Sequence, residues 1–231
     1  MNETTLTTLR DRLPSKGELT RQAILQVAAD LASIEGLEGL TIGNLAKAVG
    51  MSKGGLYAHF RSKLELQLAT IEAAGKIVDR EIGVPTRAAP PGLRRLWTLC
   101  ESYLSYSERK VFPGGCFFAN AAAELDAKPG VLRDNIRVAH GKPLMRMGER
   151  VQEAQALGEL DAKADPHQLA FELASFIREA ARLFLMDDDP SHFVRARYAI
   201  AQRLRPLLTD KSPALPEVQT PKRRERVAGT P

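Results

Sequence analysis

The chain has 231 residues, 44% of them hydrophobic, and a formal net charge of +5 at pH 7, a balance that suits a polyanionic partner. Two cysteines are too few for a disulfide framework, and no run of about 18 apolar residues is present that could span a membrane. The N-terminal residues lack the apolar core of a signal peptide, so we expect a soluble, cytoplasmic protein.

Helical periodicity extends over almost the whole chain, and no segment shows a convincing strand pattern. A polar arm is expected at residues 1–14, and a disordered tail rich in Pro, Lys, Arg and Thr at residues 209–231. The sequence predicts an all-α protein of about nine helices. Their approximate ranges are 15–34, 42–49, 53–58, 63–82, 93–108, 116–125, 131–157, a helix beginning at Pro166 and a helix from Pro190 to residue 208.

Prolines, glycines and capping residues set the expected helix ends. Gly83-Val84-Pro85 is expected to end the fourth helix, the stretch 89–92 reads as a linker, and 112–115 is a clear break. Gly141 and Pro143 are candidate kink positions in the seventh helix. Ser15, Ser62, Asp165 and Asp189 are the expected capping residues at helix starts.

The most informative stretch is residues 41–63, TIGNLAKAVGMSKGGLYAHFRSK. Its first part has apolar residues at helical spacing, Gly50 permits a sharp turn, and Ser52 is a good N-cap for a second, short helix. Two helices joined by such a turn form a helix-turn-helix, whose second helix enters the major groove of DNA.

The second helix of this motif has a composition that stability does not explain. Gly54 and Gly55 each cost about 1 kcal/mol in a helix, but they allow close approach to a surface. Lys53 can donate to guanine or phosphate. Leu56 and Phe60 should face inward. The residues predicted to contact DNA are Thr41, Ser52, Lys53, Gly54, Gly55, Tyr57, His59 and Lys63. The alternative, a helical hairpin within a core, is disfavoured by the glycine pair and the outward polar residues.

These residues, together with those just before them, resemble the DNA-binding domain of the TetR family of bacterial transcriptional regulators. The matching segments are RQAILQVA at 21–28, Gly36-Leu37, Leu40-Thr41-Ile42, Leu45-Ala46, Val49-Gly50-Met51-Ser52, Leu56-Tyr57-Ala58-His59-Phe60 and Lys63. The resemblance implies an all-helical homodimer with an N-terminal DNA-binding domain and a C-terminal domain for ligand binding and dimerisation. The Gly-Gly pair departs from members that carry a side chain at one of these positions, which leaves few side chains to read bases.

The expected domains are a helix-turn-helix domain at 15–62 and a helical ligand-binding and dimerisation domain at 63–208. Aromatic residues of the larger domain could line a cavity between helices, although each taken alone is better explained as a core residue. The candidate ligand-binding residues are Trp97, Cys100, Tyr103, Phe117, Phe118 and Asn120. The segment 114–121, GGCFFANA, resembles one found in several TetR-family ligand domains.

The last two predicted helices are unusually apolar. The resemblance implies that they form the homodimer through an intermolecular four-helix bundle, whereas packing within their own domain is the simpler alternative. A dimer would match an operator with an inverted repeat.

Several further features of the sequence are possible sites with alternative explanations. Cys116 after two glycines could sense oxidants or electrophiles, or could be a small buried residue. Asp187-Asp188-Asp189 could suggest a metal, but reads more simply as a solvated turn with an N-cap. His140, His167 and His192 lack ligand spacing, so no zinc site and no cofactor are predicted. The basic tail 222–226 could attract phosphate or simply be a solubilising end.

The sequence thus predicts a ligand-responsive DNA-binding regulator, a repressor released from its operator by a small apolar effector and associated with the nucleoid. An enzyme is the rival reading, but no phosphate-binding loop, dinucleotide motif, nucleophile elbow or metal pair supports it. A DNA-binding protein without an effector, whose larger domain only dimerises, is the third reading.

Overall fold

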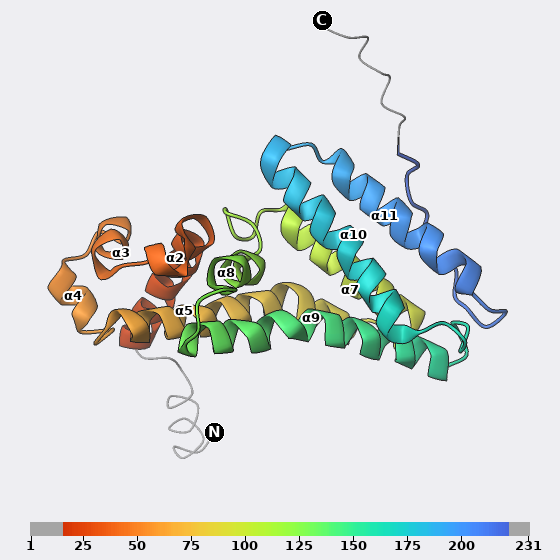
Figure 1. The fold of residues 1–231 in the computed structure, drawn as a ribbon, viewed down its shortest axis with the longest axis horizontal. Helices are drawn as coiled ribbons and strands as arrows, with labels where there is room; N and C mark the ends of the chain where they lie inside the picture. The colour runs from red at the N-terminus through yellow and green to blue at the C-terminus, as the bar shows by residue number, and fades with distance from the viewer. Residues whose placement is uncertain (1–15, 222–231) are drawn as a thin grey trace, which may run out of the picture. The chain divides into compact units, whose positions relative to one another are not determined.

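The computed structural model describes residues 16–221, which form helices joined by turns (Figure 1). The predicted all-α class is confirmed, and each of the nine predicted helices has a counterpart in this part of the chain. The helices are α2 (Lys16–Gly39), α3 (Ile42–Ala48), α4 (Lys53–Tyr57), α5 (Lys63–Val78), α6 (Val84–Ala88), α7 (Leu93–Glu108), α8 (Phe117–Leu125), α9 (Val131–Ala156), α10 (Pro166–Asp187) and α11 (Ser191–Leu204). The predicted N-terminal arm, the Ser15 cap and the basic tail lie outside the described residues.

Side-chain caps explain why several helices begin where the sequence predicts. In each case a side-chain oxygen accepts a backbone N–H of the first turn, a group that has no partner inside the helix. The pairs are Thr41 with Asn44 (3.1 Å), Ser52 with Gly55 (3.0 Å), Ser62 with Glu65 (3.1 Å) and Asp165 with His167 (2.8 Å).

The prediction that Gly83-Val84-Pro85 ends the fourth helix is wrong. A π-helical turn, Asp79–Gly83, follows α5 and leads directly into α6, where Pro85 occupies the first turn. Proline is tolerated there because first-turn N–H groups need no helical partner. Arg87 also spans the turn with a bidentate ion pair to Asp79, both N–O distances being 2.8 Å. The helical path that begins with α5 ends only at the predicted linker, where Gly92 has φ 86°.

The chain folds into two compact units, which do not follow the predicted boundary at residue 62. The first unit contains the described residues up to Ile77 together with 112–140, and the second contains 78–111 and the described residues from Gly141 onward. The difference arises because α8 packs against α2, although about 80 residues separate them. Helix α9 continues past Gly141 and Pro143 without ending.

In the first unit, α2, α3, α4, α5 and α8 enclose a core of fully buried side chains. Its largest members include Phe60, Phe112, Phe117, Leu37, Leu40, Leu45, Leu56 and Leu66. In the second unit, α7 packs against α6 and α10, and α10 packs against α11. The guanidinium of Arg197 on α11 also joins Glu101 and Glu108 of α7, at 2.6 and 2.8 Å from its Nη2 atom.

The prediction of a disordered tail from residue 209 is wrong for the residues nearest α11. Thr209 Oγ1 donates to the carbonyl of Gly158, and Ser212 Oγ donates to the carbonyl of Glu159, both at 2.5 Å. These hydroxyls bind carbonyls of the turn after α9, which the composition of the tail could not reveal. In the part of the chain that the structure describes, no helix is long and apolar enough to cross a membrane.

Candidate nucleic-acid interface

Helices α3 and α4 form the predicted helix-turn-helix in the first unit. A capping box starts α3, because the Thr41 N–H also donates to Asn44 Oδ1 at 2.7 Å. Gly50 takes φ 67° in the turn, a conformation that glycine adopts without strain. Leu45 of α3 and Leu56 of α4 are completely buried, so the two helices are held by their apolar faces.

The opposite face of α4 is open to solvent. Ser52, Lys53, Gly54 and Tyr57 are exposed, and Tyr57 keeps 54% of its surface accessible. A Cβ added to Gly54 would have its nearest neighbour, Ser52 Oγ, at 3.9 Å. No contact among the described residues therefore requires glycine at position 54, which leaves close approach of an external surface as a reason for it.

Three of the other predicted DNA-contacting residues flank this face. Thr41 is exposed, and His59 is partly exposed with its ring 6.4 Å from that of buried Phe60. Lys63 is exposed at the start of α5, and its Nζ donates to the carbonyl of Glu38 at 2.6 Å. An ammonium has three donors, so two remain for a phosphate.

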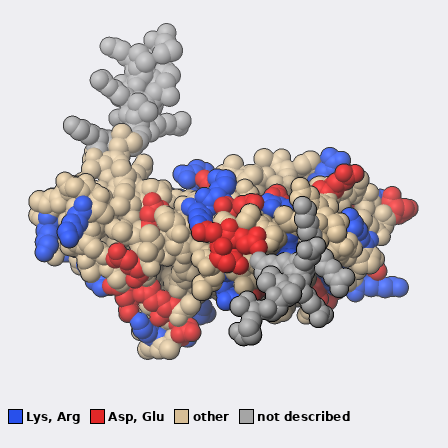
Figure 2. All heavy atoms as spheres, turned by 90° about the horizontal axis from the view of Figure 1, so that it is seen from above, with Lys and Arg blue, Asp and Glu red and all other residues tan. Residues whose placement is uncertain are grey.

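Basic side chains are also exposed on and beside the helix-turn-helix. Figure 2 shows Lys and Arg side chains gathered at its left edge, over the part of the first unit that carries α3 and α4. Lys47 on α3 and Arg61 before α5 are exposed, and neither was singled out from the sequence. Their position off the apolar stripe of the motif is the signal that could have identified them.

The six predicted ligand-binding residues are divided between the two compact units. Trp97, Cys100 and Tyr103 belong to α7 in the second unit, whereas Phe117, Phe118 and Asn120 belong to α8 in the first. Trp97, Tyr103 and Phe118 are half-buried. Cys100 is 1% exposed with its Sγ 3.7 Å from Met147 Sδ, and burial raises the pKa of its thiol to about 12.

Phe117 and Asn120 are engaged in packing and hydrogen bonds within the first unit. Phe117 is 1% exposed, and its ring packs against those of Phe112 and Phe118 at centroid distances of 5.8 and 5.2 Å. The Asn120 amide donates to the carbonyls of Ser33 and Gly114, at 3.0 and 2.7 Å. The contacts with Phe112 and Gly114 tie the turn before α8 to the helix itself.

A surface groove of about 340 Å³ does involve Trp97. Its walls are the start of α7 and the segment after α11 that was predicted to be disordered. The lining residues are Pro90, Leu93, Arg94, Trp97, Thr98, Pro213, Ala214, Leu215 and Pro216. The groove lies within the second unit and includes no other predicted ligand residue.

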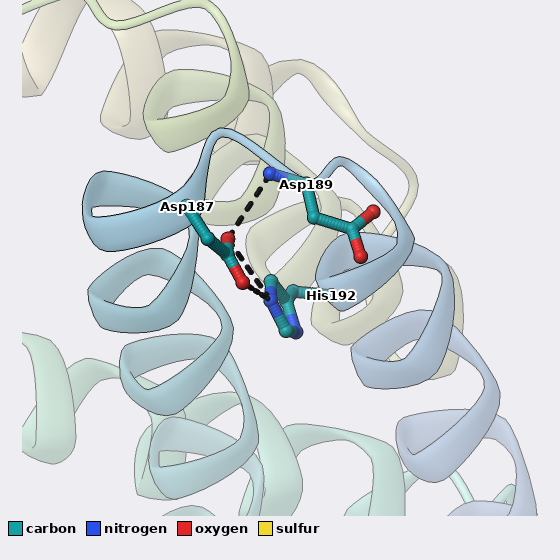
Figure 3. Close-up of side chains that lie close together, drawn as sticks. All are labelled: Asp187, Asp189 and His192. Carbon is teal, nitrogen blue, oxygen red and sulfur yellow. Dashed lines mark hydrogen bonds and ion pairs between the residues drawn. The ribbon is translucent and has the colours of Figure 1, made fainter. Parts of the chain in front are cut away.

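The turn between α10 and α11 brings His192 against the acidic run (Figure 3). Asp187, Asp189 and His192 place potential ligand atoms within 4.8 Å of one another. The imidazole Nε2 lies 2.9 Å from the Asp187 carboxylate, and this hydrogen bond lowers the pKa of Asp187. Asp187 also accepts the Asp189 N–H at 3.1 Å, and Asp189 accepts the Ser191 N–H at 2.9 Å. These bonds hold the three residues together in a capped turn.

Comparisons with known proteins agree with this geometry. The model of bacterial regulatory proteins of the tetR family matches residues 24–70, and that of the tetracyclin repressor-like C-terminal domain matches residues 92–200. The transcriptional regulator AcuR of Cereibacter sphaeroides is 28% identical over 166 residues, which cover 70% of this chain and 74% of AcuR.

Solved structures show the same fold. The crystal structure of a TetR transcriptional regulator from Chloroflexus aurantiacus is 27% identical, with a TM-score of 0.76 over 84% of this chain and 98% of that one. AibR, crystallised with isovaleryl coenzyme A and operator DNA, is 20% identical, with a TM-score of 0.61 over 81% of this chain and 99% of that one. With both family models matched and the helix-turn-helix in place, the chain belongs to the TetR family of bacterial transcriptional regulators, which are DNA-binding proteins and not enzymes.

Proposed function

We propose that this protein is a ligand-responsive repressor that binds an operator with an inverted repeat and leaves it when a small apolar effector binds. The carrying observation is the asymmetry of α4. Leu56 is completely buried, while Ser52, Lys53 and Gly54 face solvent at the beginning of the helix. The N-terminal residues of a recognition helix are those nearest the bases.

The site residues have two kinds of role in this proposal. Ser52, Lys53, Gly54 and Gly55 face the major groove, where lysine and hydroxyl donors discriminate bases. Thr41, Tyr57, His59 and Lys63 contact the phosphate backbone, which positions the protein but carries little sequence information. Lys47 and Arg61 add to the electrostatic attraction.

The proposal includes a homodimer through α10 and α11. Three large apolar side chains of α10 are exposed in the single chain: Phe171 at 53%, Leu185 at 39% and Met186 at 80%. Burying them in a second copy would remove apolar surface from water, the usual driving force of association. Phe171→Asp should therefore shift the protein from dimer to monomer in sedimentation analysis. An unchanged mass would place the interface elsewhere.

The DNA-reading role is tested with Lys53→Ala. The probe is the intergenic DNA beside the protein's own gene, searched for an inverted repeat, with a random duplex of equal length for comparison. Loss of a base contact should weaken operator binding by about 1–3 kcal/mol and reduce sequence preference. Folding should be unaffected, because Lys53 is exposed. Unchanged binding to both duplexes would contradict the assignment.

Two half-buried aromatic residues, Trp97 and Tyr103, support the proposal that an effector binds. Both lie in the segment that matches the C-terminal domain model. The relative AibR was crystallised with both an acyl coenzyme A and operator DNA. An apolar effector should change the fluorescence of Trp97 and lower operator affinity over one concentration range, with a coupling of about 1–3 kcal/mol. If a broad apolar library changes neither signal, the protein is a DNA-binding regulator without an effector.

A further inference from the structure

A backbone break in α2 lies just before the helix-turn-helix. Gly36 has φ 80° and ψ 163°, which interrupts the helix between Glu35 and Leu37. In a continuous helix the N–H of Leu37 would donate to the carbonyl of Ser33. The break frees both groups, and Leu37 is completely buried. Buried backbone groups without partners are costly, so both need replacements.

Helix α8 supplies both replacements. Asn120 Nδ2 donates to the freed carbonyl of Ser33 at 3.0 Å. Glu124 accepts the N–H of Leu37 at 2.7 Å, and with its other oxygen the N–H of Glu38 at 2.8 Å. Asn120 and Glu124 are four residues apart and therefore lie on one face of α8. One face of this helix thus bridges the two sides of the break.

The turn before α8 is shaped for this contact. The N–H of Gly114 donates to Ser33 Oγ at 3.0 Å, and a Cβ added to Gly114 would lie 2.0 Å from the Ser33 carbonyl oxygen. Any larger residue at position 114 would therefore separate the turn from α2. Because Asn120 also donates to the Gly114 carbonyl, the turn, α8 and α2 are held as one arrangement.

The segment that Glu124 holds leads directly into α3. The carbonyl of Leu37 accepts from Gln67 Nε2 at 2.7 Å, and the carbonyl of Glu38 accepts from Lys63 Nζ at 2.6 Å. Thr41, the N-cap of α3, follows three residues after Glu38. The two N–H groups bound by Glu124 therefore belong to the short segment that leads into the helix-turn-helix.

We propose that Glu124 and Asn120 are positioning residues for DNA binding. Helix α8, which the sequence places among the helices of the ligand domain, sets the path of residues 36–40 and through them the position of α3 and α4. The inference rests on the proposed DNA-binding function. It assigns no DNA contact to α8. A purely structural role would affect stability but leave the folded protein's affinity for DNA unchanged.

The test compares Glu124→Gln with Glu72→Gln, another glutamate of the first unit, 70% exposed and paired with Lys76. Each variant removes one negative charge, which by electrostatics alone should strengthen DNA binding. Glutamine at 124 has one acceptor oxygen and places an NH2 donor where the second oxygen was, so it cannot reproduce the contact in which each carboxylate oxygen accepts one backbone N–H. We expect Glu124→Gln to weaken operator binding about tenfold, comparable to losing a base contact, and Glu72→Gln to leave it equal or stronger.

Amide hydrogen exchange at Leu37 and Glu38 reports the local bonds, and thermal melting identifies conditions in which every variant is folded. Faster exchange with weaker operator binding supports the proposal. Faster exchange with unchanged binding overturns it, because α8 would then only stabilise α2. If Glu124→Gln does not fold, Asn120→Ala, which removes the amide donor to Ser33, is measured in the same way. If the wild type binds no duplex, the proposed function itself fails, and this inference with it.

Discussion

The ammonium group of Lys63 lies 2.6 Å from the backbone carbonyl of Glu38, 25 residues earlier in the chain. This hydrogen bond joins the start of α5 to the segment that precedes α3, on either side of the helix-turn-helix. The same side chain is a proposed phosphate contact. Lys63 therefore has one observed role in the folded protein and one proposed role on DNA, and the two can be tested separately.

Replacing Lys63 with methionine should reduce affinity for specific and random duplexes alike, because phosphate contacts carry little sequence information. The slope of log affinity against log salt should become shallower by about one. Loss of the bond to Glu38 should cost about 1 kcal/mol of stability or less, so binding is measured where both proteins are folded. Lys76→Met on the same helix is the control and should keep the wild-type slope. If the plots of log affinity against log salt for Lys63→Met and the wild type are parallel, Lys63 does not contact the DNA backbone.

Gly54→Ala separates folding from DNA binding. Alanine fits the space beside Gly54, so the free energy of unfolding should rise by up to about 1 kcal/mol. Gly141→Ala in α9 is a matched control, because a Cβ there has no neighbour within 4 Å. Both variants should be stabilised in urea denaturation, but only Gly54→Ala should lose operator affinity, since its methyl group points toward the groove. Full affinity of Gly54→Ala would mean that DNA does not approach this position closely.

The thiol of Cys100 should be unreactive in the native protein. Burial raises its pKa to about 12, so the thiol stays protonated and inaccessible at pH 8. In Cys116→Ser, a thiol reagent should react only after denaturation, and the unfolding rate should limit the reaction. Rapid native labelling of this variant would contradict the burial of Cys100.

The same raised pKa has a consequence for alkaline stability. The unfolded thiol loses its proton near pH 8.5, whereas the folded one retains it to about pH 12. The contribution of the buried, protonated thiol to the free energy of unfolding is fully present below about pH 8.5 and is lost as the pH rises toward 12. Cys100→Ala should therefore show a smaller fall in unfolding free energy across this window than the wild type, measured by urea titration at each pH.

Trp97 should report whether the C-terminal segment occupies its observed position. Pro213 to Pro216 form one wall of the groove that contains Trp97. A chain ending at Ser212 should expose the indole to water and shift its emission to longer wavelength, whereas a chain ending at Pro221 should match the full-length protein. Identical spectra for all three chains would mean that the segment does not cover Trp97 in solution.

The sequence by itself determined the features that depend on neighbours within one or two helical turns. The caps at Thr41, Ser52 and Asp165, the turn at Gly50 and the buried Leu56 and Phe60 follow from residue type and spacing along the chain. The exposed face of α4 follows from the same periodicity, which is why most of the candidate DNA-binding surface could be predicted.

Only the tertiary structure decided which distant segments share a unit. Asn120 was a candidate ligand residue, but its amide binds a carbonyl 87 residues away, at a helix break whose partner no periodicity reveals. His192 meets Asp187 only because the turn folds back, and Thr209 is ordered by a carbonyl at Gly158. Periodicity identifies the apolar face of a helix but not the helix that covers it, so α8 could be predicted as a helix but not as a member of the first compact unit.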